Sequence, residues 1–413
     1  ALDFTTASLD SRVTFTRTGN TATVVGSDGY IATINADLPR FDYDPVTLAC
    51  KGLLIEESRI NVILRSSEFD NASWSKTQTT VSADSTTSPD GTANADTIIE
   101  STAVADNFFI AQSVTKAASA TTYTYSVMAK QNGRNIRLYA DGNSNSNKAL
   151  VDINLSTGEL IGAASVAGTF TAASASVASL GNGWYRCILT YTSDTATTMR
   201  MRLFLLDGTS SIYTGDGTSG VYLYGAQLEA GAFPTSYIPT TTAAVTRNAD
   251  VATMTGTNFS DWYNATEGTF QVNTVPMYSS PSGTALYSLL AATNGTFTTE
   301  IKLYLYSNFI AYNMANAGVT QSDINLGTQV HGSVAKVLAA YKTDSIAGCK
   351  NASTVGTDSS ATVPVALDRL YIGCRAAASV INNNTGQYYN GHISRIGYWQ
   401  QRLLNNEVQA FSK

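Results

Sequence analysis

The sequence carries little charge for its length. Asp, Glu, Lys and Arg together make up 14% of its 413 residues, against roughly 25% in an average globular protein. The surface must therefore be built largely from Ser, Thr, Asn and Gly. Such a surface does not favour helices, whose exposed faces usually carry Glu, Lys and Arg. With 22 Tyr and 31 Gly residues, the composition instead suits short strands joined by turns.

Histidine and cysteine are both rare. The chain contains two histidines and four cysteines: His331, His392, Cys50, Cys187, Cys349 and Cys374. Because no Cys-x-x-Cys pair and no Cys/His cluster occurs, a catalytic zinc site is not expected. Secreted, disulfide-stapled domains are denser in cysteine, so we expect four thiols that pack as small apolar side chains. A Cys349–Cys374 disulfide is the alternative that the spacing leaves open.

Long runs of one residue type are missing too. No cluster of Lys or Arg occurs and the net charge is −6, so a nucleic-acid groove is not expected. No window of about 18 apolar residues predicts a membrane-spanning helix. The start, Ala1-Leu2-Asp3-Phe4, lacks the basic and apolar regions of a signal peptide, which fits a removed signal or release by lysis.

Turn residues divide most of the chain into short alternating segments. Residues 1–66 hold strand pieces but too little continuous core, so we expect this lead-in segment to pack on the adjoining domain or on another subunit. Residues 67–240 and 251–413 each show regularly spaced strands without intervening helices, and residues 241–250 form a connector. This pattern predicts an all-β fold: tandem antiparallel β-sandwiches (jelly rolls) with a small N-terminal lead-in.

Six strands are predicted in each sandwich, and one helix comes after them. The predicted strands cover residues 123–129, 136–140, 149–154, 185–191, 199–205, 221–224, 268–275, 286–291, 301–306, 334–341, 369–372 and 392–398. The helix is expected over Asn405–Phe411, with Asn405 as its cap and Glu407 near its positive end. Val408 and Phe411 would form its apolar face.

Several stretches resemble proteins of phage particles. Residues 52–61 (GLLIEESRIN) and 65–74 (RSSEFDNASW) resemble the lead-in of tail-fibre and head-spike proteins. Residues 183–186 (GWYR) and 224–229 (YGAQLE) resemble late strands of the carbohydrate-binding-module-like jelly rolls in the same proteins. Residues 391–399 (GHISRIGYW) look like the closing strand of a laminin-G or concanavalin-A-like sandwich. The resemblance implies a receptor-binding protein with two sandwiches in series.

Strand alternation indicates a candidate binding surface. Successive side chains of a strand point to opposite faces, so the Tyr, Arg and Asp residues of three strands would share one outer face if those strands share a sheet. Tyr rings stack on the apolar side of a sugar, and Arg or Asp bonds its hydroxyls or carboxylate. The candidate carbohydrate-binding residues are Arg137, Tyr139, Asp141, Arg202, Tyr222 and Tyr224, with Tyr304 and Tyr306 as the parallel case in the last domain. The competing interpretation is that this face is buried under another domain or subunit.

Signals of catalysis and metal binding are weaker. Gln329-Val330-His331 resembles the Gln-x-His strand motif of alginate-lyase-type jelly rolls, but their companion arginine-rich motif is missing. No strand offers the paired carboxylates of a sandwich glycosidase, and no catalytic residue is predicted. Loops that contain Asp could hold Ca²⁺, although ordinary turn chemistry explains them equally well. The three loops are Asp141-Gly142-Asn143, Asp207-Gly208 and Asp216-Gly217.

The sequence therefore favours a phage fibre or spike protein that binds a bacterial surface glycan for host adhesion without cleaving it. Low charge and Tyr-rich strand faces also suggest subunit interfaces, and the resemblance implies a homotrimer in the virion that meets other virion proteins through its N-terminal segment. No cofactor, nucleic acid or membrane insertion is expected. The alternatives are a polysaccharide lyase or glycosidase and a purely structural virion protein.

Overall fold

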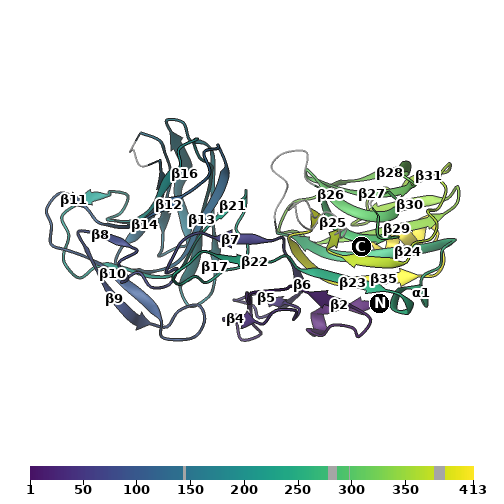
Figure 1. Cartoon of the computed structure of the whole chain (residues 1–413), viewed down its shortest axis with the longest axis horizontal. Helices are drawn as coiled ribbons and strands as arrows, with labels where there is room; N and C mark the ends of the chain where they lie inside the picture. The colour runs from purple at the N-terminus through teal and green to yellow at the C-terminus, as the bar shows by residue number, and fades with distance from the viewer. Residues whose placement is uncertain (143–145, 278–285, 297, 376–386) are drawn as a thin grey trace.

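The computed structural model has two β-lobes side by side (Figure 1). It describes residues 1–142, 146–277, 286–296, 298–375 and 387–413. Strands dominate both lobes and pair antiparallel in every sheet, which confirms the predicted all-β fold of tandem sandwiches. Helix is confined, in the described residues, to the 3-10 turn η1 (Phe4–Thr6) and to α1 (Thr257–Ser260) and α2 (Asn405–Phe411). None of these is long and apolar enough to cross a membrane.

The middle lobe is a sandwich of two six-stranded sheets. One, the β14 sheet, has the order β16-β15-β14-β19-β12-β8, and the other, the β13 sheet, has the order β17-β18-β13-β21-β10-β9. Their bounds are β8 Ser75–Thr77, β9 Thr79–Thr86, β10 Ala95–Glu100, β12 Phe109–Thr115, β13 Thr122–Asn132, β14 Asn135–Asp141, β15 Lys148–Asn154, β16 Glu159–Ala167, β17 Thr171–Ser179, β18 Trp184–Thr192, β19 Thr198–Leu206 and β21 Gly220–Ala230. A short ribbon of β11 (Asp106–Asn107) and β20 (Ile212–Tyr213) lies beside them. Inward side chains of both sheets, such as Leu138 and Leu189, form one core.

The second lobe is a larger sandwich built from both ends of the chain. Its sheets have the orders β31-β30-β29-β24-β35-β6-β5, with β1 also on β35, and β2-β23-β32-β25-β26-β27-β28. The bounds are β1 Leu2–Asp3, β2 Thr14–Thr16, β5 Phe41–Tyr43, β6 Cys50–Ile55, β23 Val251–Thr255, β24 Glu267–Pro276, β25 Leu286–Thr293, β26 Glu300–Tyr306, β27 Phe309–Asn316, β28 Val319–Thr328, β29 Ala335–Lys342, β30 Ile346–Lys350, β31 Gly356–Asp358, β32 Arg369–Ile372 and β35 Gly391–Trp399. β33 (Cys374–Arg375) pairs with β34 (Gln387–Tyr388) beside them.

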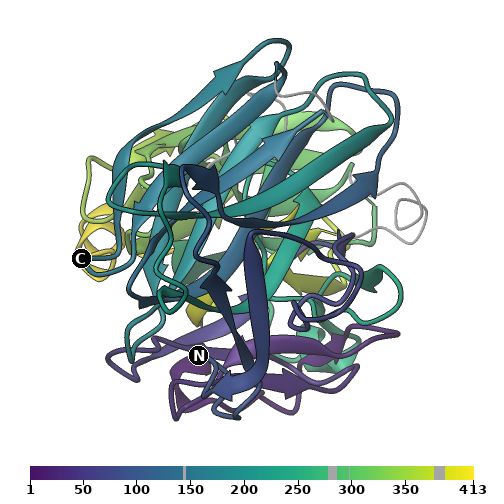
Figure 2. The same cartoon turned by 90° about the vertical axis from the view of Figure 1, so that its left-hand side faces the viewer.

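The N-terminal segment thus completes the sandwich at the far end of the sequence. Leu2 lies opposite Ile396, and Phe15 lies opposite Ala252. The middle lobe is inserted between β7 (Arg59–Asn61) and β22 (Val245–Arg247), which pair as a two-stranded bridge. Figure 2 shows the middle lobe in front of the other lobe, with the N-terminal segment along the lower side of the molecule.

A buried charge cluster lies where the N-terminal segment meets the connector. Arg17 and Arg40 bind Asp250, and Arg40 and Arg247 bind Glu56; no side chain in the group is more than 2% exposed. Glu56 also accepts bonds from the backbone N–H and hydroxyl of Ser236, at 2.8 and 2.7 Å. A buried charge that loses its partner destabilises the fold. This cluster therefore holds the N-terminal segment against the connector.

One prediction about local detail needs correction, and one open alternative is decided. The terminal helix has the expected bounds, but Leu404 rather than Asn405 is its N-cap, and the Glu407 carboxylate accepts the Leu404 N–H at 2.7 Å. Asn405 instead accepts a bond from Arg402. The prediction of unpaired thiols holds for Cys349 and Cys374, which are free and lie in different apolar clusters, so the alternative of a disulfide between them is excluded. Cys187 is also buried, whereas Cys50 is half-buried.

Candidate functional site

Four of the residues singled out from the sequence lie together on the outer face of the β14 sheet. β14 and β19 are direct neighbours, and Tyr139 lies opposite Arg202. Arg137 forms a two-point ion pair with Asp152 on β15, at 2.6 and 2.8 Å. Asp141, which has no exposed surface, contacts Arg202 at 2.8 Å and Arg200 at 3.3 Å. Both carboxylates of this face are therefore already engaged by its arginines.

The aromatic ring on this face is covered. Tyr139 is 6% exposed, and the guanidinium of Arg202 lies 4.9 Å from its ring centroid. The same guanidinium lies 5.5 Å from the ring of Phe109 and 5.7 Å from that of Phe204. This packing leaves little ring surface for a sugar, because the cation occupies the position that a stacked ligand would take.

Tyr222 and Tyr224 lie on β21, which belongs to the β13 sheet. The predicted surface required the strands now seen as β14, β19 and β21 to share a sheet, and they do not. Tyr224 is 6% exposed, donates to Asp90 at 2.9 Å and packs against Tyr237. The ring belongs to a cluster that includes Ile31, from the hairpin of β3 (Ala22–Val25) and β4 (Ile31–Ile34). Tyr222 is half-buried beside the same cluster. This part of the face is thus covered by other segments of the same chain.

Tyr304 and Tyr306 lie on β26 in the other lobe, apart from the first group. Tyr304 is half-buried, with its hydroxyl 3.3 Å from Asp323 and Lys302 5.1 Å from its ring centroid. Tyr306 is 40% exposed at the end of the strand. Neither lines any of the four hollows that are described below.

An extensive concave surface lies along the outer face of the β13 sheet, where β17 and β18 run beside the second lobe. Three hollows of about 470, 200 and 330 Å³ adjoin one another there, and we call them together the trough. The first two share Ile188, Pro234 and Met277, and the last two share Leu180. The two larger volumes fall in the range of roughly 300–1,000 Å³ that is typical of ligand sites, which often lie between domains.

Strand alternation explains the polar floor of the trough. Ser174 and Ser176 on β17 point outward, since Ala173, Ala175 and Val177 pack against the core. Ser174 lies opposite Thr190. Hydroxyl-bearing residues line all three hollows: Thr23, Thr86, Thr87, Ser88, Ser174, Ser176, Ser179, Thr190 and Ser236.

The walls of the trough come from three parts of the chain. Phe233 and Pro234, which come after β21, form one side, and Met277 and His331 from the second lobe form the other. Arg59 lies over the ring of Phe233, 4.7 Å from its centroid. Tyr30, at the turn of the N-terminal hairpin, lines the far hollow. Sequence reasoning missed Tyr30, although an aromatic residue in a hairpin turn is itself a signal.

Two carboxylates line the middle hollow, and both are held by basic partners. Asp42 lies 2.7 Å from His392 Nε2 and 3.4 Å from Lys51. Burial opposes its charge most strongly, but the bond to His392, the charges of His392 and Lys51 and the backbone N–H of Val25 together lower the pKa of Asp42. Burial likewise opposes the charge of Glu56, yet Arg247 and Arg40 hold its pKa well below its usual value. Neither group is therefore suited to donate a proton near neutral pH.

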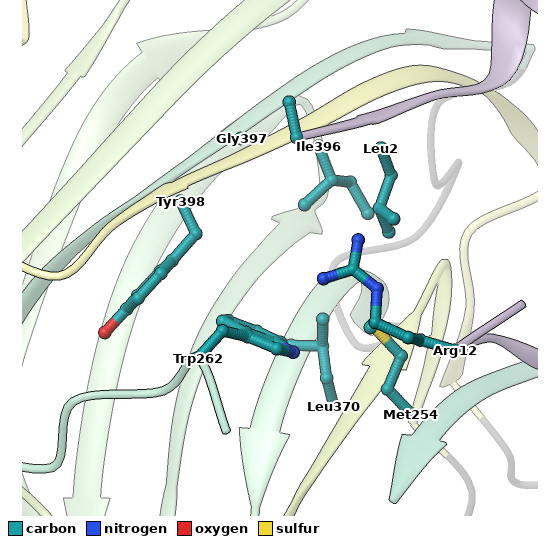
Figure 3. Close-up of a pocket in the computed structure, with 9 residues that line it drawn as sticks. Leu2, Arg12, Met254, Trp262, Leu370, Ile396, Gly397 and Tyr398 are labelled. Atoms are coloured by element: carbon teal, nitrogen blue, oxygen red, sulfur yellow. The ribbon is translucent and has the colours of Figure 1, made fainter. Parts of the chain in front are cut away.

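A fourth hollow lies in the second lobe beside the N-terminus (Figure 3). Its volume is about 40 Å³, far below the roughly 300 Å³ of a small-molecule site. Leu2, Met254 and Trp262 line it, and Arg12, which is paired with Asp10, lies at its edge. This hollow holds no more than a few atoms and is not a candidate site.

Gln329 of the lyase-like motif and the Asp141 and Asp216 side chains of two candidate calcium loops bond neighbouring groups of the chain. Gln329 is buried and bonds Ser333 and Val330, while His331 is exposed in a turn that ends before β29. Asp216 is occupied by the backbone and hydroxyl groups of Thr218 and Ser219. Asn143 lies outside the described residues. Within those residues, no group of three or more His, Cys, Asp or Glu is placed to hold a metal ion.

Comparison with known proteins gives only remote likenesses. No protein-family profile and no curated protein sequence matches the chain. It is similar to the Ruminococcus gnavus IT-sialidase CBM40 bound to alpha2,3 sialyllactose, at 14% identity over 36% of this chain and 83% of that one, with a TM-score of 0.29. It is also similar to mouse laminin alpha1 chain domains LG4-5, at 11% identity over 73% and 88% of the chains, with a TM-score of 0.25. Likenesses this distant carry no argument about ligand or activity.

Proposed function

We propose that the protein is a glycan-binding adhesion protein of a phage particle and that the trough is its binding surface. The observation that carries the proposal is a concave sheet face, lined by hydroxyl groups in all three hollows, between two β-sandwiches. Sugar hydroxyls exchange hydrogen bonds readily with Ser and Thr side chains. Tyr30 adds aromatic surface in the far hollow of the trough.

The carboxylates that line the trough are suited to binding a glycan but not to cleaving it. The two carboxylates of the trough, Asp42 and Glu56, are ion-paired or bonded to a buried histidine. Hydrolysis of a glycosidic bond commonly needs a carboxylic acid with a raised pKa as proton donor, and both pKa values are lowered instead. The virion location, the homotrimer and the attachment through the N-terminal segment belong to the same proposal and rest on the sequence resemblance.

A glycan array probed with the full chain and with a blocked variant tests the proposal. Ser176→Trp places an indole in the trough at an exposed position of β17, where it should not disturb the core. Ser82→Trp is the matched control, since Ser82 is exposed on β9 and lines none of the hollows. We expect the chain and the control to bind the same bacterial glycans and Ser176→Trp to lose them. Equal binding by all three would remove the trough as the site.

A further inference from the structure

Two cations on the floor of the trough have no carboxylate partner among the described residues. Arg186 on β18 is half-buried and donates to the hydroxyl of Ser126 at 3.1 Å. Lys130 on β13 is half-buried and lines the far hollow. Most arginines elsewhere are ion-paired, including Arg137, Arg202 and those of the junction cluster. The charges of Arg186 and Lys130 are therefore not neutralised by a carboxylate of the described residues.

The register of β13 and β18 places Arg186 and Lys130 on the same face of the sheet. Arg186 lies opposite Met128, and Trp184 lies opposite Lys130. Arg186 and Lys130 are thus diagonal neighbours on one face, a relationship with Cα atoms roughly 7–8 Å apart. Arg186 lines the middle hollow and Lys130 the far one, on either side of the shared residue Leu180. The guanidinium of Arg186 lies toward Ser126, on the far side of Met128 from Lys130. The Lys130 side chain lies beside Gly183. The two cations therefore occupy separate points along the trough.

The negative charges of the trough do not cancel these cations. Asp42 is matched by Lys51 and His392, and Glu56 by Arg40 and Arg247. The unmatched charge of the trough is therefore positive, on a chain whose net charge is −6. Cations held in a concave site attract an anion more strongly than cations on an open surface, because its walls exclude water.

We infer that the trough takes a linear acidic glycan whose anionic groups are received at separate points by Arg186 and Lys130, an inference that rests on the proposed glycan-binding function. A carboxylate or phosphate matches the planar donors of Arg186, and the ammonium of Lys130 adds a point charge. Three hollows in series suit an extended chain of several sugar units rather than one terminal sugar.

The test uses the full chain on an array of bacterial capsular and O-antigen polysaccharides. Each acidic polysaccharide is printed beside its carboxyl-reduced or dephosphorylated form. The variants are the double substitution Arg186→Gln with Lys130→Gln and the charge-matched pair Arg395→Gln with Lys336→Gln, whose residues line none of the hollows. Melting temperatures establish that both variants are folded.

We expect binding to an acidic polysaccharide to fall at least tenfold when its anionic group is removed and also in the Arg186/Lys130 variant, but not in the matched control. Loss on carboxyl reduction identifies a uronate, and loss on dephosphorylation identifies a phosphate. Equal binding to acidic and neutralised forms, or an unchanged Arg186/Lys130 variant, overturns the inference and leaves glycan binding standing. If no polysaccharide binds, the proposed function and the inference fail together.

Discussion

Arg40 and Asp250, 210 positions apart in the sequence, form an ion pair in which neither side chain has any exposed surface. Arg40 precedes β5, and Asp250 directly precedes β23. The same aspartate receives Arg17 at 3.1 Å and the backbone N–H of Glu56 at 2.9 Å. The pair thus fixes the N-terminal segment to the strand that re-enters the second lobe after the inserted middle lobe.

Asp250→Asn should destabilise the fold strongly, because it leaves Arg17 and Arg40 buried with one carboxylate fewer. Breaking a buried pair by removing one partner costs about 3–5 kcal/mol. Urea denaturation monitored by tryptophan fluorescence measures the loss. Asp10→Asn is the control, since its partner Arg12 is partly exposed and such pairs contribute about 0–1 kcal/mol. Equal effects of the two substitutions would contradict the role assigned to the cluster.

Glu56 should make the stability pH-dependent. Because its folded pKa is lowered from 4.5, its contribution is fully present above the unfolded pKa and is lost as pH falls toward the folded value. The wild-type free energy of unfolding should therefore decrease as pH is lowered from neutral through about 4. Glu56→Gln should be less stable at neutral pH and show a shallower decrease. Parallel pH profiles of the two proteins would exclude Glu56 as a source.

Tyr139→Ala tests which of two surfaces binds the glycan, the outer face of the β14 sheet or the trough. The substitution removes a ring that packs under Arg202 and against Phe204, so it should cost about 3 kcal/mol of stability. Tyr139→Phe keeps the ring and should be nearly neutral. With the trough as the site, neither change should alter glycan affinity. If Tyr139→Ala binds the glycan more weakly at a temperature where it stays folded, the binding site lies on the outer face of the β14 sheet and not in the trough.

The homotrimer is tested by sedimentation equilibrium at micromolar concentration. Three chains should sediment together, because low charge and Tyr-rich strand faces suit interfaces between subunits, and cyclic symmetry closes such contacts. A single species of 43.7 kDa would contradict this prediction.

Local alternation determined much of what the sequence could predict. Each predicted strand overlaps an observed one, and the outward positions of β14 and β19 were identified correctly, since alternation within a strand depends only on its own residues. Arg137, Tyr139, Asp141 and Arg202 therefore share a face, as expected. The terminal helix likewise has its predicted bounds, because its apolar spacing and its Glu407 are local signals.

Only the tertiary structure determines which strands pair with one another. β21 looks like β14 and β19 in sequence, yet it pairs with β13 and β10 in the other sheet, so Tyr222 and Tyr224 part from the predicted group. The N-terminal strands pair with β35 and β23 at the opposite end of the chain. The trough combines β17, β18, the segment of Phe233 and Pro234 after β21, and His331, which no local pattern relates. Alternation fixes which face a side chain takes, but non-local pairing decides what lies across from it.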